Sequence, residues 1–527
     1  MFSSISSGAL VLAVLQYVAR TSAADVNYAL SIVNEVVAPD GFPRSVVTAN
    51  GSIPGPLISA NIDDRLLVNV TNYLEDPTML RSTSIHWHGI FHRKDHAVSM
   101  DGAVSVTQCP IVPGHSFMYN FTVPQQRGTY WYHSHLSTQY CDGLIGPLVI
   151  YDPEDPHKDL YDVDDESTVI MLQEWYHTAA PSLKTETTPT PDSTLINGHG
   201  RWNVSPTSDL AVIRAQDGKR HRFRLINSGC NPSFNFTIDA HNLTVIEADG
   251  IEVEPVTVDQ LQIFAGQRYS VVVTMDKPID NYWIRAIPST QDNSTIAGGI
   301  NSAILRYDGA PIAEPRECAE NDGAKKPVIL QETDLHPLAN LEVPGEPYPG
   351  GADVVLDLTP SIANGSWMIN NVSFHAPSIP VLLQVLSGVT DAKDMLPAGS
   401  VYALPKNATV EINVKQVSDH PFHLHGHNFD VVRTSGNSKY NFNNPIRRDV
   451  VTPGQANDTI TFRFRTDNPG PWIFHCHIDW HFDHGLAVVF AEDIDEIANK
   501  DIVSPEWSDL CPLYDQLNPD KHFDLVA

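Results

Sequence analysis

Four pairs of histidines, each with a single residue between the partners, are the main chemical feature of this sequence. Residues two apart on an extended strand point to the same face, so each pair can direct two imidazoles to one place. A lone pair is most often chance, whereas four pairs together indicate a metal centre. The pairs are His86 and His88, His133 and His135, His423 and His425, and His475 and His477.

A cysteine lies inside the last of these pairs, because Cys476 separates His475 from His477. If this segment is extended, the thiolate points to the face opposite its two neighbours. The strand would therefore separate two metal sites that share one short stretch of chain.

Two further histidines can complete the site of the cysteine. His420 has the opposite parity from the pair that follows it, and His481 comes after a turn beyond Cys476. Two histidines and one cysteine form the trigonal set of blue-copper sites, and imidazole-rich sites favour copper. We therefore expect these three residues to hold one copper ion.

Zinc is the competing metal. Structural zinc sites usually gather four ligands locally, whereas eight histidines drawn from four motifs suit a multinuclear redox cluster better. His427 is a ninth candidate ligand, but its place in the motif is past the pair that faces the cluster. We interpret it as a residue that packs behind the ligands.

The segments that must position these ligands have the pattern of β-strands. Short β-branched and aromatic runs recur between Gly, Pro, Asn and Asp clusters, while helical periodicity is scarce. This pattern favours packed β-sandwiches. Strands are predicted within residues 64–74, 115–123, 210–216, 221–228, 268–275, 408–416 and 458–466.

The chain is too long for one hydrophobic core, so several domains are expected. Strand-rich units cover residues 25–152, 153–322 and 323–527, and they are joined by charged segments that contain proline. The first and third units each carry two histidine motifs, and the middle unit carries none. An ancestral duplication explains this arrangement.

The beginning of the chain predicts export. Residues 9–19 are apolar but too short to span a bilayer, and small residues follow, so residues 1–24 are interpreted as a secretory signal peptide. No later apolar run is long enough to cross a membrane. N-linked glycans are expected on some of the sequons at Asn50, Asn69, Asn120, Asn203, Asn235, Asn242, Asn293, Asn364, Asn371, Asn407 and Asn457.

The charge balance argues against two classes of partner. Acidic residues exceed basic ones by 30, and the sequence has no run rich in Lys or Arg. The positive surface that nucleic acid or an anionic membrane would require is therefore not expected.

In combination, the motifs "HWHG", "HSH", "HPFHLHGH" and "HCHIDWH" resemble those of the multicopper oxidases. Stretches such as "STLINGHGR" and "FRTDNPGPW" make nearly the whole mature chain similar to the basidiomycete-type laccases of that family. The resemblance implies an all-β fold of three cupredoxin-like Greek-key β-sandwich domains. The third domain would hold one copper ion, and a trinuclear cluster would lie between the first and third domains.

The resemblance also implies a role for each ligand among four copper ions per chain. Type 1 copper would be bound by His420, Cys476 and His481, and type 2 copper by His86 and His423. The type 3 pair would be bound by His88, His133, His135, His425, His475 and His477.

The implied activity is that of a secreted laccase, expected as a monomer. Phenols or aromatic amines would each lose one electron at the type 1 site through the edge of His481. After four such events, dioxygen would be reduced to two waters at the cluster. Such an enzyme would serve the degradation of lignin or other phenolic material.

Three residues near the ligands have roles implied by the same resemblance. Asp101 and Asp479 would relay protons to the oxygen chemistry, although Asp101 could be a turn residue and Asp479 could be structural. Leu486 would occupy the axial position of type 1 copper, where its side chain cannot act as a ligand. A leucine there favours a high potential.

The resemblance weakens at the substrate pocket. Asn231 stands where many fungal laccases have an acid, and the loop segments "TETTPTPD" and "AIPSTQDN" lack the expected aromatic residues. Acid/base assistance to phenol binding is therefore in doubt. His484 also stands where a small residue is expected.

The implied disulfides join Cys109 to Cys511 and Cys141 to Cys230. Cys318 is then left without a partner, and we interpret it as an unpaired thiol.

Two other functions compete with the laccase. A ferroxidase uses the same coppers but needs carboxylates around His481 to hold Fe(II). A secreted copper-binding or storage protein needs no catalysis, but it also has no need for Cys476 to connect two sites.

Overall fold

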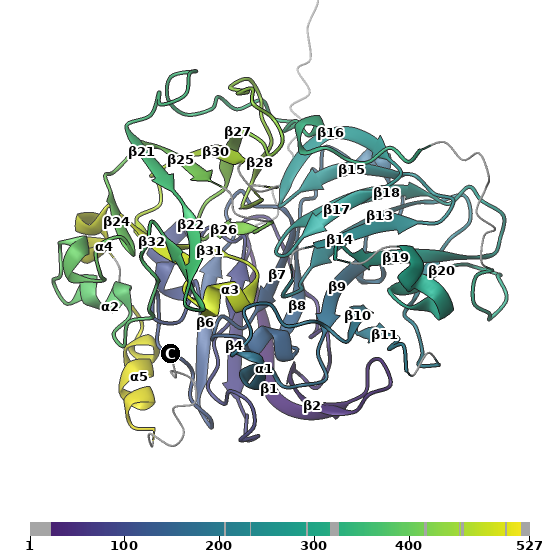
Figure 1. Cartoon of the computed structure of the whole chain (residues 1–527), viewed down its shortest axis with the longest axis horizontal. Coiled ribbons are helices and arrows are strands. Elements are labelled where there is room, and N and C mark those ends of the chain that lie inside the picture. The colour runs from purple at the N-terminus through teal and green to yellow at the C-terminus, as the bar shows by residue number, and fades with distance from the viewer. Residues whose placement is uncertain are drawn as a thin grey trace, which may run out of the picture.

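The structure is a computed structural model, and it describes residues 23–204, 207–231, 233–290, 293–316, 326–415, 419–452, 454, 458–500 and 503–517. Residues 1–22 of the expected signal peptide, and Cys318, lie outside this part of the chain. Three β-sandwiches pack around a common centre (Figure 1). The expectation of an all-β chain with three sandwiches is confirmed.

The first sandwich consists of two four-stranded sheets. One has the order β2 (Arg44–Ala49), β1 (Asp25–Val37), β4 (Arg65–Asn72) and β6 (Ser116–Thr122). The other has the order β3 (Ile58–Asn61), β8 (Ile145–Tyr151), β7 (Gly128–His133) and β5 (His86–His88). Alternate residues of β4 are buried, as a strand with one face on the core requires.

The middle sandwich has a seven-stranded and a five-stranded sheet. The larger has the order β11 (His199–Gly200), β10 (Ser193–Ile196), β9 (Val169–Trp175), β13 (Arg220–Asn227), β18 (Arg268–Thr274), β15 (Leu243–Ala248) and β16 (Ile251–Val258). The smaller has the order β12 (Val212–Ala215), β20 (Ser302–Tyr307), β19 (Asn281–Pro288), β14 (Ser233–Ile238) and β17 (Leu261–Phe264).

The third sandwich has two five-stranded sheets and a small hairpin. The first sheet has the order β21 (Val354–Leu358), β25 (Thr409–Lys415), β30 (Thr459–Arg465), β27 (Phe429–Arg433) and β28 (Arg447–Arg448). The second has the order β24 (Val401–Leu404), β32 (Ala487–Glu492), β31 (Gly470–Cys476), β26 (Phe422–Leu424) and β29 (Val450–Val451). The hairpin pairs β22 (Pro360–Ala363) with β23 (Ser366–Ile369).

The α-helices of the described chain are short. They are α1 (Ala180–Leu183), α2 (Val381–Leu386), α3 (Asp479–Asp483), α4 (Ile494–Lys500) and α5 (Pro505–Asp515). The side chain of Ser504 caps α5 by accepting a hydrogen bond from the Trp507 amide. Within the described residues, none of these helices has the length and apolar character needed to cross a bilayer.

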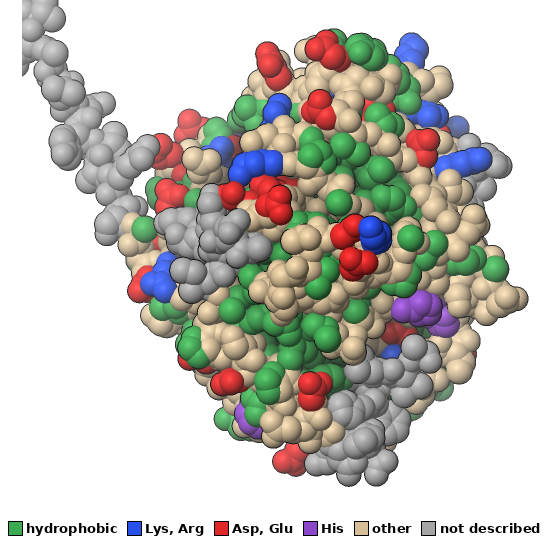
Figure 2. Space-filling view, turned by 90° about the vertical axis from the view of Figure 1, so that its left-hand side faces the viewer, with side chains coloured by type: hydrophobic (Ala, Val, Ile, Leu, Met, Phe, Trp, Pro, Cys, Tyr) green, Lys and Arg blue, Asp and Glu red, His purple; other side chains and the backbone are tan. Residues whose placement is uncertain are grey.

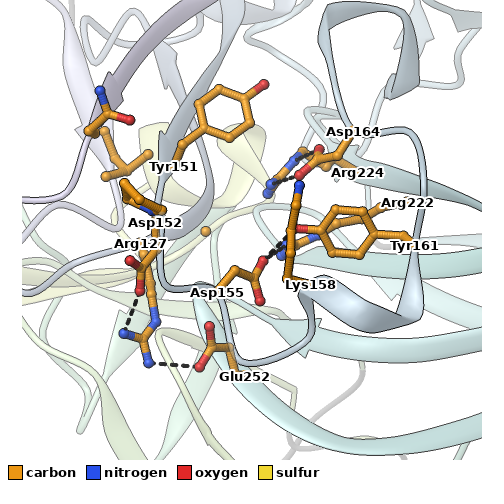
Figure 3. Close-up of a pocket in the computed structure, with 14 residues that line it drawn as sticks. Arg127, Tyr151, Asp152, Asp155, Lys158, Tyr161, Asp164, Arg222, Arg224 and Glu252 are labelled. Atoms are coloured by element: carbon orange, nitrogen blue, oxygen red, sulfur yellow. Dashed lines mark hydrogen bonds and ion pairs between the residues drawn. The ribbon is translucent and has the colours of Figure 1, made fainter. Parts of the chain in front are cut away.

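Buried charges join the first sandwich to the middle one. Arg127 pairs with Asp152 and reaches across to Glu252 at 2.7 Å, while Arg222 pairs with Asp155 at 2.6 Å. These groups line a cavity of about 210 Å³ (Figure 3). Every acid in this cavity has a basic neighbour, and the Arg127–Glu252 pair connects the two sandwiches.

The outer surface carries mixed charge. On the face shown in Figure 2, Lys and Arg side chains are dispersed among acidic and apolar ones. The chain as a whole has a net charge of -30.

Candidate metal centre

Two strand pairs bring the histidine motifs together. In the first sandwich β5 pairs with β7, which places His86 opposite His133. In the third sandwich β26 pairs with β31, which places His423 opposite His475. The second histidine of three motifs lies one or two residues past its strand, so each strand pair presents four imidazoles to the space between the sandwiches.

The eight imidazoles of the four pairs form one buried cluster. Ligand nitrogens lie within 4.8 Å of one another in three overlapping triplets, which are His86, His423 and His425, then His86, His88 and His133, and then His135, His425 and His475. The eighth, His477, has its Nε2 3.2 Å from His88 Nδ1. The expectation that the four pairs meet in space is confirmed.

Most of these rings are held by one nitrogen and leave the other free. The Nδ1 atoms of His86 and His133 lie 2.8 Å from the carbonyl oxygens of Asp101 and Ser134, respectively. The Nε2 atoms of both rings are buried without a hydrogen-bond partner. Burying unpaired polar atoms is costly, so a bound cation explains why several of them converge.

His88 presents its Nδ1 to the cluster, whereas His86 and His133 leave their Nε2 free. Its Nε2 lies 3.4 Å from a carboxylate oxygen of Asp449, and its Nδ1 faces His477. Asp449 reaches the cluster from the turn between β28 and β29. Asp449 was not predicted from the sequence, although the three charged residues inside the otherwise apolar "IRRDVV" were a signal.

The second ligand set lies on the other face of β31. Cys476 Sγ is 3.4 Å from His420 Nδ1 and 3.7 Å from His481 Nδ1, and the two imidazole nitrogens are 3.0 Å apart. All three side chains are buried. Burial raises the pKa of the Cys476 thiol and lowers the pKa of His420 to about 4. Two neutral imidazoles beside a sulfur suit a soft cation such as copper.

The two ligand sets are linked through the covalent backbone at the end of β31. Cys476 belongs to the smaller set, while its neighbours His475 and His477 belong to the cluster. The parity argument is confirmed, since the thiol and the two imidazoles point to opposite sides of the strand.

Asp101 is the acid nearest the cluster. Its carboxylate lies 2.9 Å from His425 Nδ1 and 3.3 Å from His86 Nδ1. Burial acts to raise the pKa of Asp101, but the two imidazoles and their hydrogen bonds outweigh burial and bring the pKa well below its usual range. Asp101 thus orients two rings as a carboxylate.

Asp479 has the opposite electrostatic environment. It is buried at the start of α3, and its Oδ2 lies 3.5 Å from Cys141 Sγ. Burial and the neighbouring Asp483 raise the pKa of Asp479 well above its usual range, against a smaller effect of Lys184. Loss of the proton from this carboxyl is therefore harder than from an exposed one.

A loop of the middle sandwich covers the outer edge of His481. The hydroxyl of Thr188 lies 3.2 Å from His481 Nε2. Thr188 belongs to "TETTPTPD", one of the two segments interpreted as pocket loops. His484 fastens the same loop, because its Nε2 lies 2.6 Å from the carbonyl oxygen of Lys184 and its Nδ1 lies 2.9 Å from that of Gly365.

Asn231 is buried and is linked to the helix that carries His481 through the Tyr176 hydroxyl. Its amide Nδ2 donates to the Tyr176 hydroxyl at 2.6 Å, and the Trp480 indole donates to the same hydroxyl at 3.2 Å. Beneath them, burial raises the pKa of Glu174 to about 7, although backbone hydrogen bonds from Cys230 and Asn231 oppose the rise. Glu174 and Tyr176 were not recognised from the sequence.

The disulfides and His427 also match the expectations from the sequence. Disulfides join Cys109 to Cys511 and Cys141 to Cys230, as expected. His427 is outside both ligand sets and pairs with Glu492 at 2.8 Å, so it packs behind the cluster as expected.

Comparison with known proteins agrees with this geometry. Three models of the family described as multicopper oxidase match residues 31–155, 166–310 and 374–496. A laccase of Phlebia radiata is 52% identical over 529 residues, which cover 99% of this chain and all of that protein. The chain belongs to the multicopper oxidase family. Laccase-2 of Trametes versicolor is 53% identical to this multicopper oxidase, over 93% of this chain and 94% of the relative.

Solved structures confirm the fold of this multicopper oxidase. The crystal structure of a laccase from Botrytis aclada superimposes with a TM-score of 0.81 at 34% identity, covering 95% of this chain and 93% of that one. Fet3p, described as a multicopper oxidase that functions in iron import, gives a TM-score of 0.80 at 29% identity over 95% of this chain and 98% of its own. The sandwiches are therefore three cupredoxin-like domains.

The donor set of this multicopper oxidase fits its family's cofactor. The family and the histidine clusters imply four copper ions, one of type 1, one of type 2 and a type 3 pair. The convergent unpartnered imidazole nitrogens and the separate Cys476 set provide ligands of the kinds that these ions require.

Proposed function

We propose that this chain is a laccase that oxidises phenols and aromatic amines by one electron each and reduces dioxygen to water. When bound, the copper ions supply the electron transfer and the oxygen reduction. The observation that carries the proposal is the position of Cys476 in one ligand set and of both its neighbours in the other. A storage protein has no use for this connection.

The ligand roles follow the two buried sets. His420, Cys476 and His481 would hold type 1 copper, and His86 and His423 would hold type 2 copper. The type 3 pair would be held by His88, His133, His135, His425, His475 and His477. Leu486 would lie beside the type 1 set, because its backbone hydrogen-bonds to both Cys476 and His481, and its side chain offers no ligand atom.

Two carboxyl groups would move protons to and from the cluster. Asp101 contacts His86 and His425 directly, so a proton it accepts is next to the ligands. Asp479 lies on the helix that follows His477 and would supply protons from the other side of the cluster. Carboxyl groups are suitable relays because they exchange protons rapidly.

The donor would bind at the outer edge of His481. Thr188 already occupies hydrogen-bond distance of its Nε2, so a phenol hydroxyl would replace the Thr188 hydroxyl there. Asn231 would position the phenol, with its amide held by Tyr176.

The domain limits, the secretion and the donor class that we propose follow the family. We propose domains at residues 25–152, 153–322 and 323–527 after a signal peptide at 1–24, with secretion as a monomer bearing N-linked glycans. Lignin fragments or other environmental phenols would be the donors.

Steady-state oxygen uptake by the copper-loaded protein tests this function. A dimethoxyphenol should support uptake, with one dioxygen consumed for four donors oxidised. Fe(II) is the comparison donor, because the similar Fet3p functions in iron import. Asp483, an acid near His481, is already paired with Lys184 at 3.3 Å, so we expect poor use of Fe(II). Uptake with Fe(II) alone would show a ferroxidase instead, and uptake with neither donor would remove the enzyme assignment.

A further inference from the structure

The middle domain supplies no histidine pair, yet one of its turns touches the cluster. Gly266 has a φ of +83°, and a methyl group on its Cα would lie 2.8 Å from His477 Cδ2 and 3.0 Å from His88 Cε1. The backbone of this turn therefore forms a wall against two rings of the cluster. Only glycine gives the rings that room.

Arg268, two residues further on, connects all three domains. It is fully buried, and its guanidinium binds both carboxylate oxygens of Asp449 in the third domain at 2.6 and 2.7 Å. Its Nε donates to the carbonyl oxygen of Thr129 in the first domain at 3.0 Å. A planar guanidinium that makes these contacts fixes the position of the Asp449 carboxylate.

The fixed carboxylate faces His88. Its Oδ1 lies 3.4 Å from His88 Nε2, an electrostatic contact rather than a hydrogen bond, and the Asp449 carbonyl oxygen lies 3.0 Å from Nδ1 of the ligand His423. His88 Nδ1 faces His477 and the cluster. Carboxylates that hold the far nitrogen of a ligating histidine orient the ring and tune its affinity for metal.

We propose that the turn Gly266–Arg268 of the middle domain is a positioning element of the trinuclear cluster. Gly266 sets the separation of the His88 and His477 rings, and Arg268 acts on His88 through Asp449. This inference rests on the proposed function, because it assumes that the eight histidines bind copper. It gives the middle domain a part in a metal site for which it provides no ligand.

Two variants with matched controls test the role. Gly266→Ala adds a methyl group against the two rings, while Gly218→Ala adds one at a similar φ of +70° with no atom within 4 Å. Arg268→Gln removes a buried guanidinium that holds Asp449. Its control, Arg463→Gln, removes an equally buried guanidinium that binds Glu411 at 2.7 Å, away from both ligand sets.

The measurements are copper retained per chain after dialysis against graded chelator, the blue absorption, and the thermal unfolding midpoint. We expect Gly266→Ala and Arg268→Gln to lose the cluster copper at about 10- to 100-fold lower chelator concentration than the unchanged protein. Their blue absorption should remain. Both controls should hold copper like the unchanged protein, even where their unfolding midpoints fall.

Three results would overturn the role. One is retention of copper by both variants at the level of the unchanged protein. Another is an equal loss of copper in the controls, which would show general destabilisation. The third is loss of the blue absorption together with the cluster copper. An unchanged protein that binds no copper would instead overturn the proposed function, and this inference with it.

Discussion

Cys476 Sγ lies 3.4 Å from His420 Nδ1 on one face of β31, while the next residue, His477, places its Nε2 3.2 Å from His88 Nδ1 in the cluster. Two adjacent residues thus belong to two different ligand sets. This relationship requires a strand that is buried on both faces, and all residues of β31 are buried.

Leu486→Met should lower the potential of the type 1 site, because a thioether at the axial position stabilises Cu(II). The exchange nearly conserves volume, so the fold should tolerate it. Redox titration of the blue absorption measures the effect, with Leu404→Met in β24 as a buried control. An unchanged or higher potential would show that Leu486 is not the axial neighbour.

Asn231→Asp should raise kcat/KM for phenols at acidic pH by roughly tenfold, or about 1.4 kcal/mol, because a carboxylate can take the phenolic proton and an amide cannot. The Tyr176 hydroxyl, which now contacts the amide, can donate to the new carboxylate. A non-phenolic donor that loses only an electron is the control, and its rate should barely change. An equal response of both donors would place Asn231 away from the phenolic hydroxyl.

His484→Ala should loosen the loop that covers His481, because both ring nitrogens contact backbone carbonyl oxygens, one of them on Lys184. Backbone amides at residues 184–188 should then exchange hydrogen faster, and KM should change more than kcat. His375→Ala, at an exposed histidine, is the comparison. Unaltered exchange at these amides would mean that other contacts hold the loop.

Glu247 should make the junction of the first and middle domains sensitive to acid. Burial acts to raise its pKa, but Arg222, Arg224 and several hydrogen bonds outweigh burial and lower the pKa to about 2 from 4.5. Because the folded value is depressed, the stabilisation of about 3 kcal/mol is present above pH 4.5 and is lost as the pH falls through about 2.

Urea unfolding at pH 6 and at pH 2 measures this contribution. Glu247→Gln should be clearly less stable than the unchanged protein at pH 6, and the difference should shrink at pH 2. A difference that is independent of pH would mean that Glu247 is not ionised in the folded protein.

Local sequence predicted the strands and the meeting of the histidine pairs well. Residues 64–74 became β4, where alternating burial leaves a period of two in the sequence, and residues 408–416 became β25, which is buried along most of its length. The histidine pairs were found by the same period. These features depend on neighbours along the chain, which the sequence displays directly.

Contacts between domains were not predictable in this way. Thr188 contacts His481 across 293 residues, and Asp449 reaches His88 from a turn in another domain. Hydrophobic periodicity contains no information about which loops meet once the sandwiches pack. The burial of Asn231 against Tyr176 was also missed, because these residues are 55 apart in the chain and meet only through the packing of the middle domain.

The copper content and blue absorption of Cys476→Ser, beside those of the unchanged protein, test the central claim most directly. The unchanged protein should be blue and hold four coppers per chain. Because the two ligand sets lie on opposite faces of β31, the variant should lose the blue absorption, one copper and the oxidation of phenols, while the cluster keeps its copper. A variant that stays blue and active would contradict the account, and so would one that keeps all of its copper.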